Sequence, residues 1–244
     1  MVESQAIDGV VFDIGGVFLV PHPEPIGEAL ADAGLEAPAE PDRYREAHYR
    51  GARALTDLLS DNGHVDDTDH DVWASYDRGY FSTLGVADDD LDRAHGARQR
   101  QRTRGVMGVW RLDLPVNITG FHRLAAAGMA LAIVSNNDGT AAQQMVEHGV
   151  CQVGDGPLPS VATVVDSTVV GVAKPDPAIF SPAVDALGAP PERLLYVGDT
   201  VHADVRGATA AGMQAVQLDP FDLHREFDHP RVADVGALAS ILLD

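Results

Sequence analysis

Short apolar runs alternate with helical patterns at the start of the chain and throughout its second half. An unbroken apolar run is typical of a parallel strand covered on both faces, and four such runs lie at residues 9–13, 129–135, 161–165 and 194–198. Helical periodicity appears at residues 117–127, 139–148, 177–187, 203–211 and 234–243. This alternation predicts an α/β fold, with a doubly wound parallel sheet as a Rossmann-like core.

The alternation stops between residues 21 and 114. The sequence PHPEP opens this segment, and arginine-rich, acidic helical patterns follow at 42–59 and 90–104 without intervening strands. We therefore predict an inserted α-helical domain. The predicted domains are a core of residues 1–20 with 115–244, and an insertion of residues 21–114.

Charge and composition narrow the classes of partner. With 17 basic and 37 acidic residues, the formal net charge is −20. Such a field repels nucleic acid and anionic membrane surfaces, so we expect neither as a partner. The acidic runs at 66–71 and 88–92 favour solvated loops or helix starts over metal sites.

The sequence features that bear on cellular location agree with one another. No segment approaches the roughly 18–20 apolar residues of a membrane span, and the N-terminus has no basic, apolar leader pattern. The single cysteine, Cys151, excludes an intrachain disulfide and is more typical of a buried or loop residue than of a nucleophile. We expect a cytoplasmic protein.

Lys174 is the only lysine of the chain, and the other 16 basic residues are arginines. A guanidinium does not replace an ammonium point charge. Because the acidic protein would repel a phosphorylated substrate, a phosphate site would need a local cation of this kind.

Polar residues follow the predicted strands at their carboxyl ends, where open α/β sheets bind ligands. Three predicted strands end at or lead into Asp13, Ser135 with Asn136, and Asp199 with Thr200. Lys174 and Asp204 lie near the starts of predicted helices.

These residue types suit phosphoryl transfer, which depends on positioning and charge neutralisation. Asp13 can attack phosphorus as a nucleophile. Ser135 and the N–H groups opening the helix at 139–148 suit phosphate oxygens, and Lys174 supplies positive charge. Asp13 and Asp199 offer the carboxylate oxygens that Mg²⁺ takes. Each residue alone has an equally good structural explanation, such as a turn or a cap, but their joint placement favours one site.

On these motifs the sequence resembles the haloacid dehalogenase (HAD) superfamily of hydrolases, in the branch with a helical cap after the first strand. The four motifs span residues 10 to 213 and stand in the family's order. They are FDIGGV, AIVSNN, VAKPDPAIF and VGDTVHADVRGATAAGM.

The resemblance implies specific roles for the site residues. It implies a phosphoaspartyl intermediate on Asp13, and Mg²⁺ held by Asp13, Asp199 and the main-chain oxygen of Gly15, with Asp204 in the outer coordination shell. The phosphate-binding set is predicted as Gly16, Ser135, Asn136 and Lys174.

Gly15 departs from the pattern of most phosphatases of the family, which carry an aspartate there as general acid and base. A glycine keeps the main-chain oxygen but loses the proton donor. General acid–base catalysis contributes roughly 10²–10⁴ in rate. We therefore expect substrates with good leaving groups, such as sugar-1-phosphates, acyl phosphates or aryl phosphates.

A substitute acid is a second possibility, and His22 in the segment after the first strand is one candidate. A solvated loop histidine is the simpler interpretation of that residue. Arg45, His48, Tyr49 and Arg53 form either a substrate-facing stripe or a solvated helix face, and Trp110 favours packing over substrate contact.

Three alternatives remain beside a Mg²⁺-dependent phosphatase of a small phosphorylated metabolite. A 2-haloacid dehalogenase would use the same nucleophile, but two further acids, Asp199 and Asp204, would repel its carboxylate substrate. A phospho-switch protein would carry its phosphorylated acid on a middle strand. A catalytically silent phosphate-binding protein is supported by Gly15 alone. The sequence leaves the substrate and the oligomeric state open.

Overall fold

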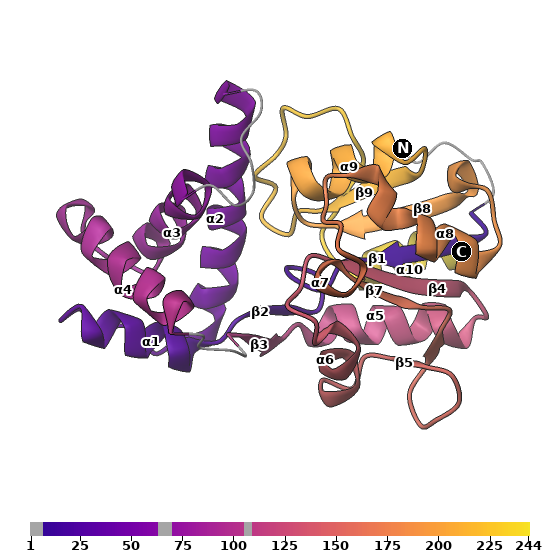
Figure 1. The fold of residues 1–244 in the computed structure, drawn as a ribbon, viewed down its shortest axis with the longest axis horizontal. Coiled ribbons are helices and arrows are strands. Elements are labelled where there is room, and N and C mark those ends of the chain that lie inside the picture. Colours follow the sequence, from indigo (N-terminus) through magenta and orange to yellow (C-terminus); the bar gives the residue numbers. More distant parts are fainter. Residues whose placement is uncertain (1–6, 63–69, 105–108) are drawn as a thin grey trace. The chain divides into compact units, whose positions relative to one another are not determined.

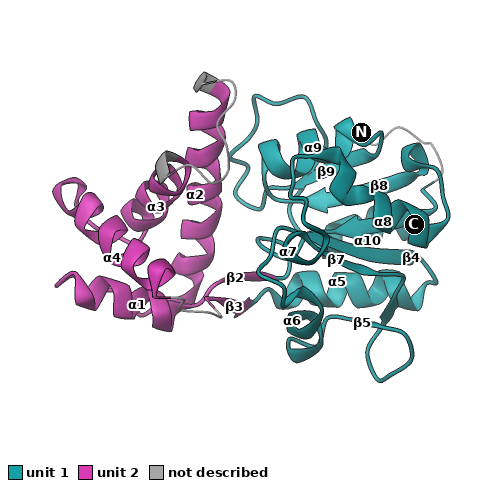
Figure 2. Ribbon diagram, viewed as in Figure 1, with its two compact units in different colours: residues 1–18, 113–244 teal, residues 19–112 magenta. Residues whose placement is uncertain are grey.

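The chain forms two compact units in this computed structural model, which describes residues 7–62, 70–104 and 109–244. One unit comprises residues 1–18 and 113–244, and the other comprises residues 19–112 (Figure 2). The second unit is an insertion between the first strand of the first unit and the rest of its sheet (Figure 1).

A six-stranded sheet forms the centre of the first unit, and its strands all run parallel (Figure 1). The strand order is β10-β9-β8-β1-β4-β7. The strands are β1 (Gly9–Phe12), β4 (Ala130–Ser135), β7 (Val164–Asp166), β8 (Leu194–Gly198), β9 (Gln214–Leu218) and β10 (Arg231–Val232). The predicted α/β fold with a doubly wound parallel sheet is confirmed.

One predicted strand differs in the structure. Residues 161–165 do not form a single strand, because the chain breaks after β6 (Ser160–Val161), which pairs with β5 (Gln152–Val153) in a separate two-stranded sheet. Only β7 joins the main sheet, and it reaches one residue further than predicted, to Asp166. Two neighbouring strands at one edge of the sheet, β9 and β10, were not among the predicted ones, because β9 mixes polar and apolar residues and β10 has only two residues.

Helices follow most strands of the first unit, close to the predicted ranges. They are α5 (Pro115–Ala126), α6 (Ala141–Glu147), α7 (Ser167–Val170), α8 (Ser181–Leu187), α9 (Gly207–Ala210) and α10 (Val235–Leu243). The predicted helix at 177–187 begins as a 3₁₀ turn, Pro177–Phe180, before α8. The predicted helix at 203–211 begins as a π-helical segment, Val201–Arg206, before α9.

The two faces of β1 pack against different helices, because successive side chains of a strand point to opposite faces. Val11 belongs to a buried cluster with Ala183 of α8 and Ala208 of α9. Phe12 instead contacts Phe121 of α5, with ring centroids 5.3 Å apart. A strand covered on both faces needs apolar residues at consecutive positions, and this explains the unbroken apolar runs of the sequence.

The second unit is built from helices and one short two-stranded sheet (Figure 2). Its elements are β2 (Leu19–Pro21), α1 (Pro23–Asp32), α2 (Pro41–Asn62), α3 (His70–Thr83), α4 (Leu91–Thr103) and β3 (Trp110–Asp113). The pairing of β2 with β3 brings the entry and the exit of the insertion together.

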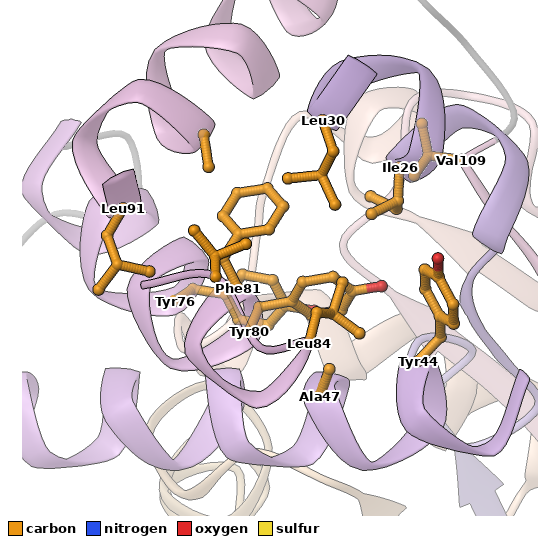
Figure 3. Close-up of a cluster of buried hydrophobic side chains, with 12 residues drawn as sticks. Ile26, Leu30, Tyr44, Ala47, Tyr76, Tyr80, Phe81, Leu84, Leu91 and Val109 are labelled. Carbon is orange, nitrogen blue, oxygen red and sulfur yellow. The ribbon is translucent and has the colours of Figure 1, made fainter. Parts of the chain in front are cut away.

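An aromatic core holds these helices together (Figure 3). Tyr76 and Tyr80 of α3 stack with ring centroids 5.8 Å apart, and Phe81 meets Tyr80 edge to face. Ile26 and Leu30 of α1 join the same buried cluster. The unit therefore has its own hydrophobic core.

The acidic runs of the insertion divide between described and undescribed residues. Residues 66–69 lie outside the described part of the chain. Asp88–Asp90 form an exposed 3₁₀ turn that leads directly into α4, as expected of a helix start. None of the helices in the described parts of the chain combines the length and apolar character that crossing a bilayer requires.

Candidate active site

Three neighbouring strands of the sheet end in polar residues at the same edge. Strand β1 lies between β8 and β4, and the chain continues from these strands into Asp13, Asp199 and, at the last residue of β4, Ser135. All three residues are buried. The Asp13 N–H donates to the carbonyl of Val197 at 2.9 Å, which continues the β1–β8 ladder to Asp13.

Lys174 extends into this group of carboxylates. Its Nζ atom lies 2.9 Å from Asp13 Oδ1 and 2.6 Å from Asp204 Oδ1, and its side chain is 2% exposed. The ammonium also donates to the hydroxyl of Tyr196 at 2.9 Å. The only lysine of the sequence is therefore an internal cation among site carboxylates rather than a surface residue.

Both oxygens of Asp204 are engaged within the protein. Oδ1 accepts from Lys174, and Oδ2 accepts from the Thr200 N–H at 2.9 Å and the Thr200 hydroxyl at 2.6 Å. The π-helical turn makes this return possible, since the Val205 N–H donates to the Thr200 carbonyl five residues earlier. Asp204 is thus better placed to hold the site together than to be a direct metal ligand.

The site carboxylates could hold a metal ion. Asp13, Asp199 and Asp204 each offer an oxygen, and these atoms lie within 4.8 Å of one another. Three carboxylates clustered around one ammonium favour a divalent cation at this place. The oxygen donors are those that Mg²⁺ prefers. Because Asp204 is already engaged on both oxygens, Asp13 and Asp199 are the carboxylates that fit direct ligation.

Burial and neighbouring charges shift the acidities of the site in different directions. Burial raises the pKa of Asp13 to about 6, against the attraction of Lys174, and the other two carboxylates add to the rise. Burial also opposes ionisation of Asp204, but the charge of Lys174 and the hydrogen bonds from Lys174 and Thr200 hold the pKa of Asp204 below the usual range. Burial disfavours the Lys174 ammonium, yet Asp13 and Asp204 together raise its pKa. Asp204 and Lys174 therefore form the fixed ion pair of the site, and Asp13 is the carboxylate that gains most from an added cation.

Asn136 serves the site through its side chain in a way that the sequence did not suggest. Its Oδ1 accepts from the Lys174 N–H at 2.8 Å, and its Nδ2 donates to the Lys174 carbonyl at 3.0 Å. The predicted role in phosphate binding would therefore fall to the main chain of Asn136, because the side chain clamps the backbone of Lys174.

Asp166, at the carboxyl end of β7, was missed by the sequence analysis. Its carboxylate accepts from the N–H groups of Gly139 (3.0 Å), Ala141 (3.1 Å) and Thr168 (2.9 Å). It thereby caps α7 and fixes the loop that leads from Ser135 into α6. The signal in the sequence was an aspartate next to Ser-Thr after an apolar run, a common capping pattern.

The glycine pair after Asp13 has one conformationally demanding position. Gly16, and not Gly15, has a left-handed φ, of 67°. A side chain at position 16 would be strained there. Gly15 has no left-handed φ, so its backbone conformation does not by itself require a glycine.

The candidates of the inserted segment have partners within their own unit. His22 Nδ1 accepts from the Glu24 N–H at 3.2 Å and so caps α1. His48 is buried and lies 2.9 Å from the Tyr76 hydroxyl, which is incompatible with a fully solvated helix face at that position. Arg53 pairs with Asp57, four residues on in α2.

Two further residues follow the packing interpretation. Trp110 packs against the aromatic core of the second unit, with its ring 5.1 Å from that of His48. Cys151 is buried, and burial raises the pKa of its thiol to about 12, which leaves it without thiolate character at neutral pH.

A family model of haloacid dehalogenase-like hydrolases matches residues 7–212. The match covers most of the chain and includes every residue of the site described above. The chain belongs to this family of hydrolases.

Curated relatives match shorter stretches. A phosphoserine phosphatase of Thermus thermophilus is 38% identical over 92 residues, which cover 38% of this chain and 34% of the relative. A glyceraldehyde 3-phosphate phosphatase of Methanopyrus kandleri is 49% identical over 55 residues, covering 22% of this chain and 24% of the relative. The chain thus spans about a third or less of the length of these two relatives.

Solved structures share the fold across nearly the whole chain. A HAD hydrolase of Bacillus subtilis bound to magnesium gives a TM-score of 0.58 at 16% identity, covering 98% of this chain and 99% of the other. A HAD phosphatase of Thermococcus onnurineus gives 0.55 at 22% identity, covering 97% and 98%. A 2-haloacid dehalogenase of Pseudomonas syringae gives 0.53 at 18% identity, covering 97% and 98%. Phosphatases and dehalogenases share this architecture, so the choice of reaction depends on the site.

Proposed function

We propose that this protein is a Mg²⁺-dependent phosphatase of small phosphorylated metabolites that acts through a phosphoaspartyl intermediate on Asp13. The observation that carries the proposal is the arrangement around that residue. The Lys174 ammonium lies 2.9 Å from its Oδ1 atom, and carboxylate oxygens of Asp199 and Asp204 lie within 4.8 Å. The phosphatase names of the relatives support the same reaction class.

Asp13 is the nucleophile in this proposal. One carboxylate oxygen attacks phosphorus, the bond from phosphorus to the leaving-group oxygen breaks, and the leaving group departs as an anion into solvent. Water then attacks phosphorus and loses a proton to solvent, and the bond between phosphorus and the Asp13 oxygen breaks to return the Asp13 carboxylate and release inorganic phosphate. The Asp13 position suits this role because the strand ladder fixes its backbone and the carboxylate is buried beside a cation.

The anionic phosphoryl group would be held by Lys174, by the Ser135 hydroxyl and by main-chain N–H groups of the loop that follows Ser135. Asp166 and Asn136 keep this loop and the backbone of Lys174 in place. Preorganised donors of this kind stabilise charge that develops on the transferring group. We include the main chain of Gly16, whose left-handed backbone only glycine adopts readily.

The donor set of the site fits Mg²⁺. Asp13 and Asp199, with the main-chain oxygen of Gly15, would hold the ion, and Asp204 would stand in its outer shell. When bound, Mg²⁺ would supply charge neutralisation for the phosphoryl oxygens. The clustering of the three carboxylates and the raised pKa of Asp13 support a cation at this place.

The substrate class follows from Gly15. With no carboxylic acid at this position, expulsion of a poor leaving group lacks its proton donor. We therefore propose substrates whose leaving group departs as a stable anion, such as sugar-1-phosphates, acyl phosphates or aryl phosphates.

The test of the proposal is phosphate release from p-nitrophenyl phosphate, with Mg²⁺ and with EDTA. We expect metal-dependent turnover by the wild type and a loss of about a thousandfold or more in Asp13→Asn, which removes the nucleophile. The matched control is Asp185→Asn, on the exposed side of α8, which should retain wild-type turnover. Absence of turnover by the wild type at every Mg²⁺ concentration, on this activated ester, would refute the proposal.

A further inference from the structure

The hydroxyl of Tyr196 lies among the charged groups of the site, although this residue belongs to the middle of β8. The side chain is fully buried. Its oxygen accepts from Lys174 Nζ at 2.9 Å, and it lies 3.0 Å from Asp204 Oδ1 and 3.0 Å from the carbonyl oxygen of Val134. A strand residue thus contributes a polar group to a site that is otherwise built from strand ends and loops.

The Lys174 ammonium has three N–H groups, and two of them donate hydrogen bonds to described residues. One donates to Asp204 Oδ1 at 2.6 Å, and one donates to Tyr196 at 2.9 Å. Asp13 Oδ1, at 2.9 Å, is an ion-pair neighbour that lies outside hydrogen-bond geometry. Because the ammonium is tetrahedral, two fixed N–H directions determine the third, so Asp204 and Tyr196 together set where the remaining N–H points.

Tyr196 is itself held on several sides. Its single hydroxyl proton can be donated to Asp204 or to the Val134 carbonyl, which directly precedes Ser135. The ring of Phe180 packs edge-on against the tyrosine ring, with centroids 5.0 Å apart. The hydroxyl therefore cannot move without disturbing β4 and the segment after Lys174.

We propose that Tyr196 is a positioning residue that fixes the rotation of the Lys174 ammonium and so leaves the third N–H for the phosphoryl group that Asp13 receives. The inference rests on the proposed function for its catalytic consequence, but the positioning of the ammonium is a property of the free protein. A phenylalanine in place of Tyr196 leaves one buried N–H of Lys174 without an acceptor and removes one of the two fixed directions.

The single lysine of the chain permits a direct test. Protein labelled with ¹⁵N-lysine gives one side-chain ammonium signal in NMR spectra, and that signal belongs to Lys174. We expect the wild-type ammonium protons to exchange slowly with water, and Tyr196→Phe to exchange at least about tenfold faster, with a shifted signal. An exchange rate and shift unchanged in Tyr196→Phe would overturn the inference.

Tyr80→Phe is the matched control, because Tyr80 is equally buried and its hydroxyl has no hydrogen-bond partner within the described part of the protein. This variant should leave the ammonium signal unchanged. With p-nitrophenyl phosphate and Mg²⁺, kcat should fall about tenfold or more in Tyr196→Phe and stay at the wild-type value in Tyr80→Phe. A lower melting temperature with unchanged kcat in Tyr196→Phe would show a structural role only and overturn the inference.

The NMR measurement and the kinetic measurement test the inference and the proposed function separately. If the wild type hydrolyses no phosphate ester, the proposed function fails, and the ammonium signal still decides whether Tyr196 positions Lys174. If the wild type is active and the ammonium signal does not respond to Tyr196→Phe, the positioning role fails alone.

Discussion

At the scale of single residues, the proposed function makes Gly15 the residue that would decide which phosphate esters the site hydrolyses. Lys174 and the carboxylates of Asp199 and Asp204 lie around Asp13. What the sequence lacks, two residues after Asp13, is an acid that could protonate a leaving group. The backbone at position 15 would accept other residues, because of the two glycines only Gly16 has a left-handed φ.

Gly15→Asp should therefore widen the substrate range. A carboxylic acid at this position would donate a proton to a poor leaving group, so we expect kcat/KM for an alkyl ester such as glycerol phosphate to rise about tenfold or more relative to p-nitrophenyl phosphate. Gly15→Asn has nearly the same size and donates no proton of this acidity, so its ratio should stay at the wild-type value. Equal ratios in both variants would contradict the leaving-group argument.

At the scale of elements, the site depends on loops that carboxylates hold at the strand ends. Asp166 is the clearest case. It is 5% exposed, and it accepts hydrogen bonds from the main-chain N–H groups of Gly139, Ala141 and Thr168. It orders the loop after Ser135 through hydrogen bonds from main-chain N–H groups. Its role is thus to shape this loop.

Asp166→Asn should destabilise the fold and loosen this loop. The amide presents an NH₂ group where a carboxylate oxygen accepted, so one buried N–H loses its acceptor, at a cost of about 1–3 kcal/mol in the free energy of unfolding. Urea denaturation would measure the change, with Asp185→Asn as the exposed control. A midpoint equal to that of the wild type would show that the carboxylate does not hold the loop.

The sequence predicted those elements whose hydrophobic pattern reflects their own burial. Strand β1 is an example, because its apolar residues cover both faces. The local sequence also places the four motifs at strand ends and helix entries. The position of Asp166, the clamp of Asn136 on Lys174 and the hydroxyl of Tyr196 depend on contacts across about 25 to 62 residues of sequence. Such contacts leave no periodic signal, because each is a single polar group placed by the tertiary fold.

At the scale of the whole molecule, the site carries a cation inside a strongly acidic protein. The net charge of −20 contrasts with the single ammonium of Lys174 beside Asp13. The overall field opposes the approach of a phosphorylated substrate, and short-range donors must compensate once it arrives. Screening by salt should therefore affect binding more than chemistry.

Added salt should lower KM for an anionic phosphate ester at saturating Mg²⁺. Raising the ionic strength from about 0.01 to 0.1 M shortens the screening length from about 30 to 10 Å, which weakens long-range repulsion and leaves the buried site little changed. We expect KM to fall about twofold or more while kcat stays constant. Steady-state kinetics in potassium chloride would check this, and a KM that rises with salt would show that local attraction dominates the approach.

The central claim, that Asp13 receives the phosphoryl group, is tested most directly on the residue itself. A turnover mixture with p-nitrophenyl phosphate and Mg²⁺ in ¹⁸O-water is quenched in acid, and the mass of the peptide that contains Asp13 is measured. We predict a phosphoryl adduct on this peptide, ¹⁸O in the released phosphate and none retained in Asp13, because water attacks phosphorus. A peptide that never carries phosphate during turnover, or that gains ¹⁸O in its carboxylate as attack on the acyl carbon requires, would contradict the account.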